Sequence, residues 1–531
     1  MLAKGAVENY LNERVEDFTW VKEEPLAQLQ AAIREVTDPL GFEFKTKPYR
    51  HQLDSFFVGL CNSQWLYYLD MGLGKTKVIL DLITLSTLEH PGTRYLVVVP
   101  SDVNLEGWEE EVALHSDLSC TLLEGSSEDK MQKVLDGGSD LFVVTYPGLL
   151  HLCSSKVENK KKGKMKMKMD PKKIRKLNSV VDGLILDEVH KVKNSKSVTF
   201  SVMRQLVKNK LMVYGLTGTP FGKDPIDLWS QFFLIDGGDT FGTSAGFFRE
   251  IFYIKSTGFA GSTKYTFDVR LDNVLTKKMR NGSLRYRDKE CQDLPSMVEM
   301  VKRVQFDPEA YTYYLPVRDG LKRSQIEKDY EQTENNFTRL RELCSGFTTI
   351  VLDDGTKHKV EFDKPAKIEM LRGILEGTAY DTKVVIFHNF VQSGRIIEKL
   401  LMDMEIEYVS ARGETRDKVG NIRKFKDPKS PVRVLIANAN TAGVGGNFQR
   451  VSNRIIFYES PLSPIVRKQC IKRVYRGGQA RGKVFITDII VQASVEEKIL
   501  ESIREGENLF HSIVNNNIGV DAIRVPLIHH V

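Results

Sequence analysis

The chain has few cysteines, and none of them is spaced as a metal ligand. Its 531 residues include six thiols, and no two of them form a CxxC pair; they are Cys61, Cys120, Cys153, Cys291, Cys344 and Cys470. This scatter argues against a zinc site and against a disulfide scaffold, and it indicates reduced thiols in a cytosolic or nuclear compartment.

Long apolar runs are missing as well. No stretch approaches the roughly 18 apolar residues that a membrane helix needs, and the longest apolar stretches have the length of strands. Residues 1–18 carry charges where a secretion signal would need an apolar block. We therefore expect no membrane partner and no secretion. A cytoplasmic location follows, or a nuclear one if the host is eukaryotic.

Charge of one sign is only weakly in excess. The formal net charge is +6, with 27% charged and 41% hydrophobic residues, which is ordinary for a globular protein. A slight positive excess permits a polyanionic partner without demanding one. The length is too great for one core and fits about two to four domains.

Short apolar strands alternate with helical segments in two parts of the chain. The first set lies at 95–100, 141–146, 183–188 and 211–220, and the second at 384–390, 432–440, 453–461 and 483–490. Such alternation predicts an α/β fold with parallel sheets covered by helices on both faces. We expect a helical lead-in over 1–44, lobes over 45–235 and 365–505, and a tail over 506–531. The segment between the lobes, 236–364, is expected to be mainly helical, with one or two long helices over 307–347.

One segment, 157–176, is rich in lysine. A solvated and partly disordered insertion would have this composition. Contact with a nucleic-acid backbone and a nuclear-import signal are the alternatives, and the sequence leaves all three open.

The stretch Met71–Thr76 is a candidate phosphate-binding loop between a strand and a helix. Gly72 and Gly74 let backbone N–H groups turn toward phosphate oxygens, and the following helix N-terminus favours an anion. Lys75 would reach the β- and γ-phosphates and Thr76 would ligate magnesium, with Met71 and Leu73 completing the loop. Position 69 is Leu69 where the full pattern has glycine, so an unrelated glycine turn is the alternative.

Two adjacent carboxylates end the apolar strand at 183–188. Asp187 would bind Mg²⁺ directly or through water, and Glu188 would polarise the attacking water. His190 is the weakest member of the group, because a histidine there could only link strand ends. An acidic strand-to-loop turn is the structural alternative.

Near the other end of the chain, Arg473 and Arg476 are one helical turn apart and precede a Gly-Gly-Gln. Phosphoryl transfer needs positive charge as the γ-phosphate leaves, and arginines from another domain supply it. A helix would point both guanidiniums at one anion. A solvated helix face is the alternative.

These segments, taken in order, resemble helicase superfamily two, and specifically its Swi/Snf-like branch of double-stranded DNA translocases. Further matching segments are 47–60, 97–112 with its Trp108-Glu109 pair, 216–236, 384–390, 412–416, 439–461, 469–479 and 492–503. The resemblance covers about 45–505. It implies that Gln52 reads the adenine and that Gly445 and Gln469 also lie at the nucleotide. Gly222, Lys223 and Lys472 depart from the family pattern, which puts fine coupling in doubt more than ATP hydrolysis.

By this resemblance we expect two RecA-like lobes that use ATP and Mg²⁺ and translocate on duplex DNA without sequence specificity. We expect a monomer of the compact bacterial, phage or viral type, because the chain has little room for flanking reader modules; no protein partner can be named. A strand-separating or branch-migrating helicase would carry the same motifs. A non-motor clamp or loader subunit is the alternative of another class, and two arginines in the same chain speak against it. An RNA-directed ATPase is a further alternative, which the trailing Leu-Trp-Ser disfavours.

Overall fold

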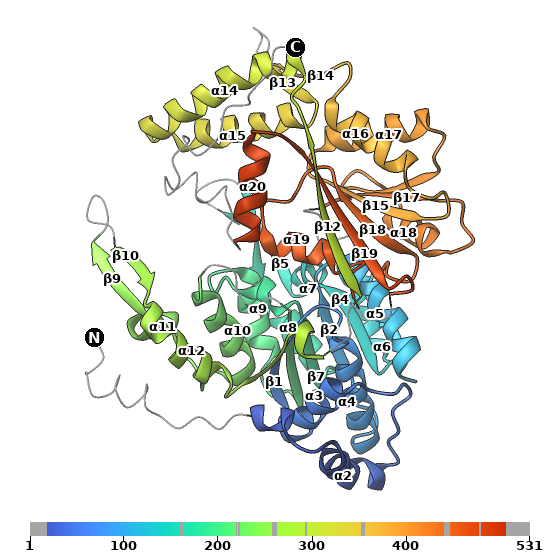
Figure 1. Ribbon diagram of the computed structural model, residues 1–531. Helices are drawn as coiled ribbons and strands as arrows, with labels where there is room; N and C mark the ends of the chain where they lie inside the picture. Colours follow the sequence, from blue (N-terminus) through green and yellow to red (C-terminus); the bar gives the residue numbers. More distant parts are fainter. Residues whose placement is uncertain are drawn as a thin grey trace. The chain divides into compact units, whose positions relative to one another are not determined.

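The computed structural model divides into two compact units, Met1–Gln292 and Asp293–Val531. It describes residues 18–159, 164–218, 220, 224–257, 263–291, 295–351, 356–439, 447–476 and 479–505. Each unit is built around its own parallel sheet (Figure 1). Within these ranges, no helix combines the length and the apolar character needed to span a bilayer.

The first unit contains a sheet of seven parallel strands in the order β11-β1-β8-β7-β2-β4-β3. The strands are β1 (Gln64–Leu69), β2 (Tyr95–Val99), β3 (Cys120–Leu122), β4 (Leu141–Thr145), β7 (Gly183–Asp187), β8 (Met212–Leu216) and β11 (Ser283–Tyr286). The four strands predicted in this part of the sequence are confirmed as β2, β4, β7 and β8. Because all strands are parallel, their carboxyl ends share one edge of the sheet.

Helices cover both faces of this sheet, as the continuous apolar strands predict (Figure 1). In β1, Trp65 and Tyr67 pack on one side while Leu66 and Tyr68 pack on the other. The first side is covered by α2 (Leu26–Thr37), α3 (Arg50–Cys61), α4 (Lys75–Glu89) and α5 (Asp102–His115). The second side is covered by α6 (Ser127–Asp136), α7 (Tyr146–Leu152), α8 (Pro171–Asn178), α9 (Val198–Leu206), α10 (Ile226–Asp236), α11 (Ala245–Phe252) and α12 (Asp272–Met279), and α13 (Asp288–Cys291) follows β11.

The lysine-rich segment forms regular structure where the structure describes it. β5 (Ser154–Asn159) and β6 (Lys164–Met169) pair antiparallel, and α8 follows directly. Met169 packs against the core, and Ile174 and Leu177 are buried in it. The described residues are therefore structured, because apolar side chains of the segment pack against the core. Residues 160–163 lie outside the described residues, so the interpretation as a partly disordered insertion stays a prediction there. A second hairpin, β9 (Tyr253–Thr257) and β10 (Thr263–Phe267), follows α11.

The second unit contains six parallel strands in the order β12-β19-β18-β15-β17-β16. They are β12 (Ser296–Val304), β15 (Lys383–His388), β16 (Tyr408–Ala411), β17 (Val434–Asn438), β18 (Ser452–Phe457) and β19 (Lys483–Val491). The helices are α14 (Pro308–Glu327), α15 (Tyr330–Cys344), α16 (Ala366–Glu376), α17 (Val391–Asp403), α18 (Lys418–Lys426), α19 (Pro464–Ile471) and α20 (Val495–Arg504), with a hairpin of β13 (Phe347–Val351) and β14 (Lys357–Glu361). The prediction of two parallel sheets is confirmed.

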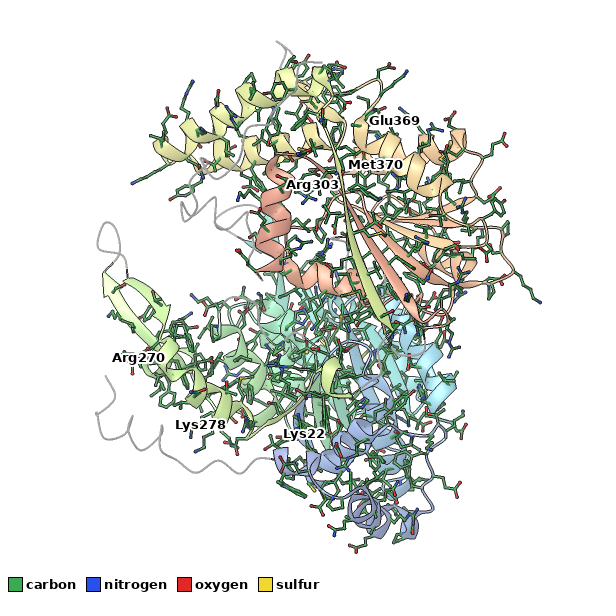
Figure 2. The ribbon with its side chains drawn as sticks, viewed as in Figure 1. Lys22, Arg270, Lys278, Arg303, Glu369 and Met370 are labelled. Carbon is green, nitrogen blue, oxygen red and sulfur yellow. The ribbon has the colours of Figure 1, made fainter. Side chains whose placement is uncertain are left out.

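The segment 236–364 contributes edge strands to both sheets as well as helices. β11 lies at one edge of the first sheet, where Lys22 donates to the Arg285 carbonyl at 2.6 Å (Figure 2). β12 lies at one edge of the second sheet, where Arg303 Nε contacts Glu497 at 3.2 Å on α20. The long helical stretch is two helices, because Lys328 takes a left-handed conformation with φ 58° and ends α14.

Candidate functional site

The loop between β1 and α4 has the backbone shape of a phosphate cradle. Gly72 and Gly74 have φ of 90° and 74°, a region that side chains with a Cβ rarely adopt. A Cβ on Gly74 would also overlap the side-chain amide nitrogen of Gln52. α4 begins at Lys75, so the N-terminus of this helix follows the loop directly, and a helix N-terminus favours an anion such as phosphate.

The start of α3 holds this loop in place. His51 Nε2 and Gln52 Nε2 contact the Leu73 carbonyl at 2.9 and 3.2 Å, and the Tyr49 N–H donates to Gln52 Oε1 at 2.9 Å. Both ends of the Gln52 amide are thus engaged within the chain. Gln52, predicted to read the adenine, lies directly against the phosphate loop, and its adenine contact stays a prediction.

Lys75 lies beside the two predicted carboxylates. Its Nζ donates to the Leu69 carbonyl at 2.9 Å, which places the ammonium at the end of β1. The charge of this ammonium is one of the influences that lower the pKa of both Asp187 and Glu188. Thr76 follows in the first turn of α4 and is half-buried. The predicted phosphate lysine and the predicted carboxylates therefore share one electrostatic environment.

Asp187, the last residue of β7, is fixed by two donors. Trp108 Nε1 donates to Asp187 Oδ2 at 3.0 Å, and the Glu188 N–H donates to Asp187 Oδ1 at the same distance. The Tyr146 hydroxyl donates to the Asp187 carbonyl at 2.9 Å. Burial, and then the neighbouring charge of Glu188, raise the pKa of Asp187 to about 6. A carboxyl group with a raised pKa is poised for a cation that would offset the cost of burying its charge.

Glu188 is held in a different network. Its φ of 49° is unusual for a residue with a Cβ. The Thr217 hydroxyl donates to Glu188 Oε2 at 2.8 Å, and His190 Nδ1 lies 3.1 Å from the same oxygen and 3.0 Å from the hydroxyl. Burial opposes ionisation, but His190, Lys75 and Thr217 together outweigh it and lower the pKa of Glu188 to about 2. His190 is therefore a positioning residue, as the sequence allowed.

The donor set at this edge fits magnesium better than a transition metal. Within the described ranges, no cluster of three or more His, Cys, Asp and Glu side chains could hold a metal ion. Thr76 and Asp187 supply two hard oxygen donors, and Mg²⁺ is commonly held by one or two protein oxygens together with substrate phosphates and water. These two residues would hold the ion.

In the second unit, Arg473 and Arg476 lie beyond α19, in the turn that follows it, rather than on a helix as their spacing predicts. Val474 is fully buried, and the Phe448 N–H donates to the Arg473 carbonyl at 2.7 Å. The backbone therefore leaves the helical path after α19 and packs against the core. Arg476 Nη1 donates to Asn447 Oδ1. Both arginines are half-buried on the same turn.

Other predicted residues of this unit fall in different surroundings. Gln469 is half-buried on α19, and Lys472 is buried with its ammonium 4.9 Å from the Tyr475 ring centre. Gly445, Gly222 and Lys223 lie outside the described residues. Their expected roles stay predictions.

Several residues that organise the site were given no role from the sequence. In the first unit these are Thr217, Trp108 and Tyr146. In the second, Arg467 forms two hydrogen bonds with buried Asp488 at 2.7 and 2.6 Å, which fixes α19 to β19. A single polar residue at a strand end is a weak sequence signal for a functional role. These partners are identified only in the structure, where segments distant in the sequence come together.

A glycine loop and paired carboxylates lie at the carboxyl edge of one parallel sheet, and an arginine pair lies in a second unit with its own parallel sheet. This is the architecture of a helicase-like protein with two lobes. A model of the SNF2-related domain matches residues 62–349, and one of the helicase conserved C-terminal domain matches residues 366–478. The chain belongs to the SNF2-related family. The resemblance to the Swi/Snf-like branch and the expectation of two RecA-like lobes are confirmed.

The chain is also similar to curated relatives and to a solved structure. The chain is 26% identical to the DNA repair and recombination protein RAD54-like of Drosophila mojavensis, over 84% of this chain and 60% of that protein. The mouse RAD54-like protein is 24% identical, over 85% of this chain and 63% of its own length. The chain thus spans about three fifths of these relatives. The Sulfolobus solfataricus SWI2/SNF2 ATPase core in complex with dsDNA is 23% identical, with a TM-score of 0.39, over 90% of this chain and 95% of that one.

Proposed function

We propose that this chain is an ATP-driven motor that translocates on double-stranded DNA and remodels DNA or protein–DNA complexes. The observation that carries the proposal is the phosphate loop of the first unit, with Lys75 acting electrostatically on Asp187 and Glu188. ATP with Mg²⁺ is the proposed fuel. A site that binds γ-phosphate beside a buried, ionised carboxylate is suited to hydrolysis.

Each residue has a proposed task in that reaction. The loop N–H groups and Lys75 bind the β- and γ-phosphates, while Thr76 and Asp187 hold Mg²⁺, which neutralises developing charge on the phosphates when bound. Glu188, kept ionised by His190 and Thr217, orients the attacking water. Arg473 and Arg476 stabilise the leaving phosphoryl group, and the two units must close on one nucleotide for this to happen.

The proposed DNA partner is duplex, bound through its phosphates without sequence preference, by a monomer in the cytoplasm or in a eukaryotic nucleus. Support comes from the family and from RAD54-like relatives whose names place them in DNA repair and recombination. We propose a role in that area. An origin in a bacterium, phage or virus stays a prediction.

The test compares ATP hydrolysis by the full chain with duplex DNA, single-stranded DNA and RNA. We expect duplex DNA to stimulate hydrolysis at least about tenfold more than either single strand. Lys75→Ala serves as the inactive control, and Lys208→Ala, at an exposed lysine after α9, controls for loss of a charge.

Motor action is tested by displacement of a third strand bound to a duplex. A translocase removes the third strand while the duplex stays paired, whereas a strand-separating helicase also releases single strands from the duplex. Hydrolysis that no nucleic acid stimulates would overturn the proposal and favour a non-motor ATPase.

A further inference from the structure

The described residues of β5, β6 and α8 carry a concentrated positive charge. Residues 154–159 and 164–178 contain eight lysines and arginines against two carboxylates. Their net charge of +6 equals the formal net charge of the whole chain. The rest of the protein is therefore neutral overall. The positive excess of the whole chain equals the charge of this one small element.

This basic hairpin, defined as β5, β6 and α8, is held together by its own hydrogen bonds, and Met169, Ile174 and Leu177 pack it against the core of the first unit. Ser155 Oγ donates to Asp170 Oδ2 at 2.8 Å, and the Asp170 N–H donates to the Cys153 carbonyl at 2.9 Å. Asp170 Oδ1 caps α8 by accepting the Lys172 N–H at 3.0 Å. Its carboxylate is held in this cap and forms no ion pair with the five exposed cations named below.

The exposed cations come from all three elements of the basic hairpin. They are Lys156 on β5, Lys168 on β6, and Lys172, Arg175 and Lys176 on α8. Within the part of the chain that the structure describes, none of these five forms an ion pair. Two of them lie in the last turn of α8, where the helix dipole favours a cation, but the dipole gives no reason for the other three.

The kind of cation and the small amount of exposed apolar surface indicate the partner. Val157 on β5 is exposed, but a single valine offers little to insert into a bilayer. Seven of the eight basic residues are lysines, which bind phosphate as point charges and do not impose the planar fork of arginine. A membrane surface would need apolar side chains that insert beside the charges. On α8, Ile174 and Leu177 are buried in the core and cannot do so.

We propose that the basic hairpin is an auxiliary DNA-binding surface that contacts the phosphate backbone of duplex DNA. This inference rests on the proposed function, since it assumes DNA as the partner. The surface would retain DNA through charge alone, without reading sequence, as a motor that crosses any sequence requires.

The test measures the affinity of the full chain for duplex DNA over a range of salt concentrations. The variant Lys156→Gln/Lys168→Gln/Lys172→Gln removes one exposed lysine from each element. We expect log Kd to depend less steeply on log salt, by about 0.9 for each lost phosphate contact and thus by up to about 2.7. The triple Lys→Arg variant at the same positions keeps the charge and should keep the wild-type slope.

A matched control removes three exposed cations elsewhere in the first unit, Arg34→Gln/Lys133→Gln/Lys208→Gln. For this control, the slope of log Kd against log salt should stay within about 0.5 of the wild-type slope. The inference would be overturned if the salt dependence of DNA affinity flattened equally in both Gln triples, or in neither. It would also be overturned if the Gln triple in the basic hairpin lost binding to anionic vesicles or to polyglutamate while the salt dependence of its DNA affinity stayed unchanged. Thermal unfolding of each variant verifies folding. Failure of the proposed function would instead appear in the unmodified chain, as hydrolysis that DNA does not stimulate.

Discussion

At the scale of single residues, Asp187 and Glu188 are neighbours in the chain but have opposite pKa shifts. Burial and the charge of Glu188 raise the pKa of Asp187 to about 6, whereas His190, Lys75 and Thr217 outweigh burial and lower that of Glu188 to about 2. A group with so low a pKa is a weak proton acceptor. We infer that Glu188 acts by orienting water through its charge.

Glu188→Gln should therefore separate ATP binding from hydrolysis. The substituted side chain keeps an oxygen for the Thr217 hydroxyl but loses the charge that orients water, so we expect hydrolysis to fall by about 10² or more. ATP affinity should change by less than about threefold, and DNA retention in ATP should increase. Single-turnover hydrolysis and ATP titration measure the two quantities. Hydrolysis near the wild-type rate would exclude Glu188 as the residue that positions water.

The pH dependence of Mg²⁺-dependent ATP binding tests Asp187. Its folded-state pKa is above the ordinary value, so the carboxylate takes up a proton as the pH falls through about 6 and binding is lost on that side. Higher Mg²⁺ competes with the proton and should move the midpoint to lower pH. Glu188→Gln removes the like charge and should also lower the midpoint. If the midpoint responds neither to Mg²⁺ concentration nor to Glu188→Gln, the loss of ATP binding at low pH is due to another group.

At the scale of elements, the phosphate loop depends on Gly74 for two separate reasons. The residue has a φ of 74°, and a Cβ would overlap Gln52. Gly92 offers a matched comparison, because its φ is 87° but no atom lies within 4 Å of a built Cβ. Gly92→Ala should cost about 1–2 kcal/mol of unfolding free energy with ATP affinity unchanged. Gly74→Ala should in addition weaken ATP binding at least about tenfold.

Titration of ATP into each variant, together with thermal unfolding, makes the comparison. In a Gly74→Ala/Gln52→Ala chain the overlap is relieved while the left-handed strain remains. Equal losses of ATP affinity in the Gly74 and Gly92 variants would show that backbone strain, and not the shape of the loop, controls binding.

The elements predicted from sequence were those with a strong apolar signal. β2, β4, β7 and β8 are central strands buried on both faces, and their continuous apolar runs identified them. The edge strands β11 and β12 were not predicted, because they carry charged residues and are partly exposed. In β6, lysine and methionine alternate strictly, which is typical of a strand, but the high lysine content hid this pattern. Arg473 and Arg476 are on the same short segment, as expected, but Val474 and Phe448 end the helix in a way that no local pattern signals.

At the scale of the whole molecule, the residues that we propose to act on the nucleotide are divided between two compact units. The first holds Lys75, Asp187 and Glu188, and the second holds Arg473 and Arg476. The motif order along the chain predicted this division, since the family resemblance covers both units. The sequence did not predict how each unit is held together, because pairs such as Arg467–Asp488 join segments that no spacing rule connects.

Arg476→Ala tests whether the two units act on one nucleotide. An arginine that acts on the transition state contributes chiefly to turnover, so we expect single-turnover hydrolysis at saturating DNA to fall by at least about 10². ATP affinity should change little. Arg473→Ala should behave similarly if both guanidiniums converge, and more mildly if it only anchors the turn. Arg372→Ala, which removes a half-buried partner of Asp403 on another helix, is the matched control and should leave hydrolysis unchanged. Near-normal rates in Arg476→Ala would make these arginines surface charges, and the two-unit mechanism would fail.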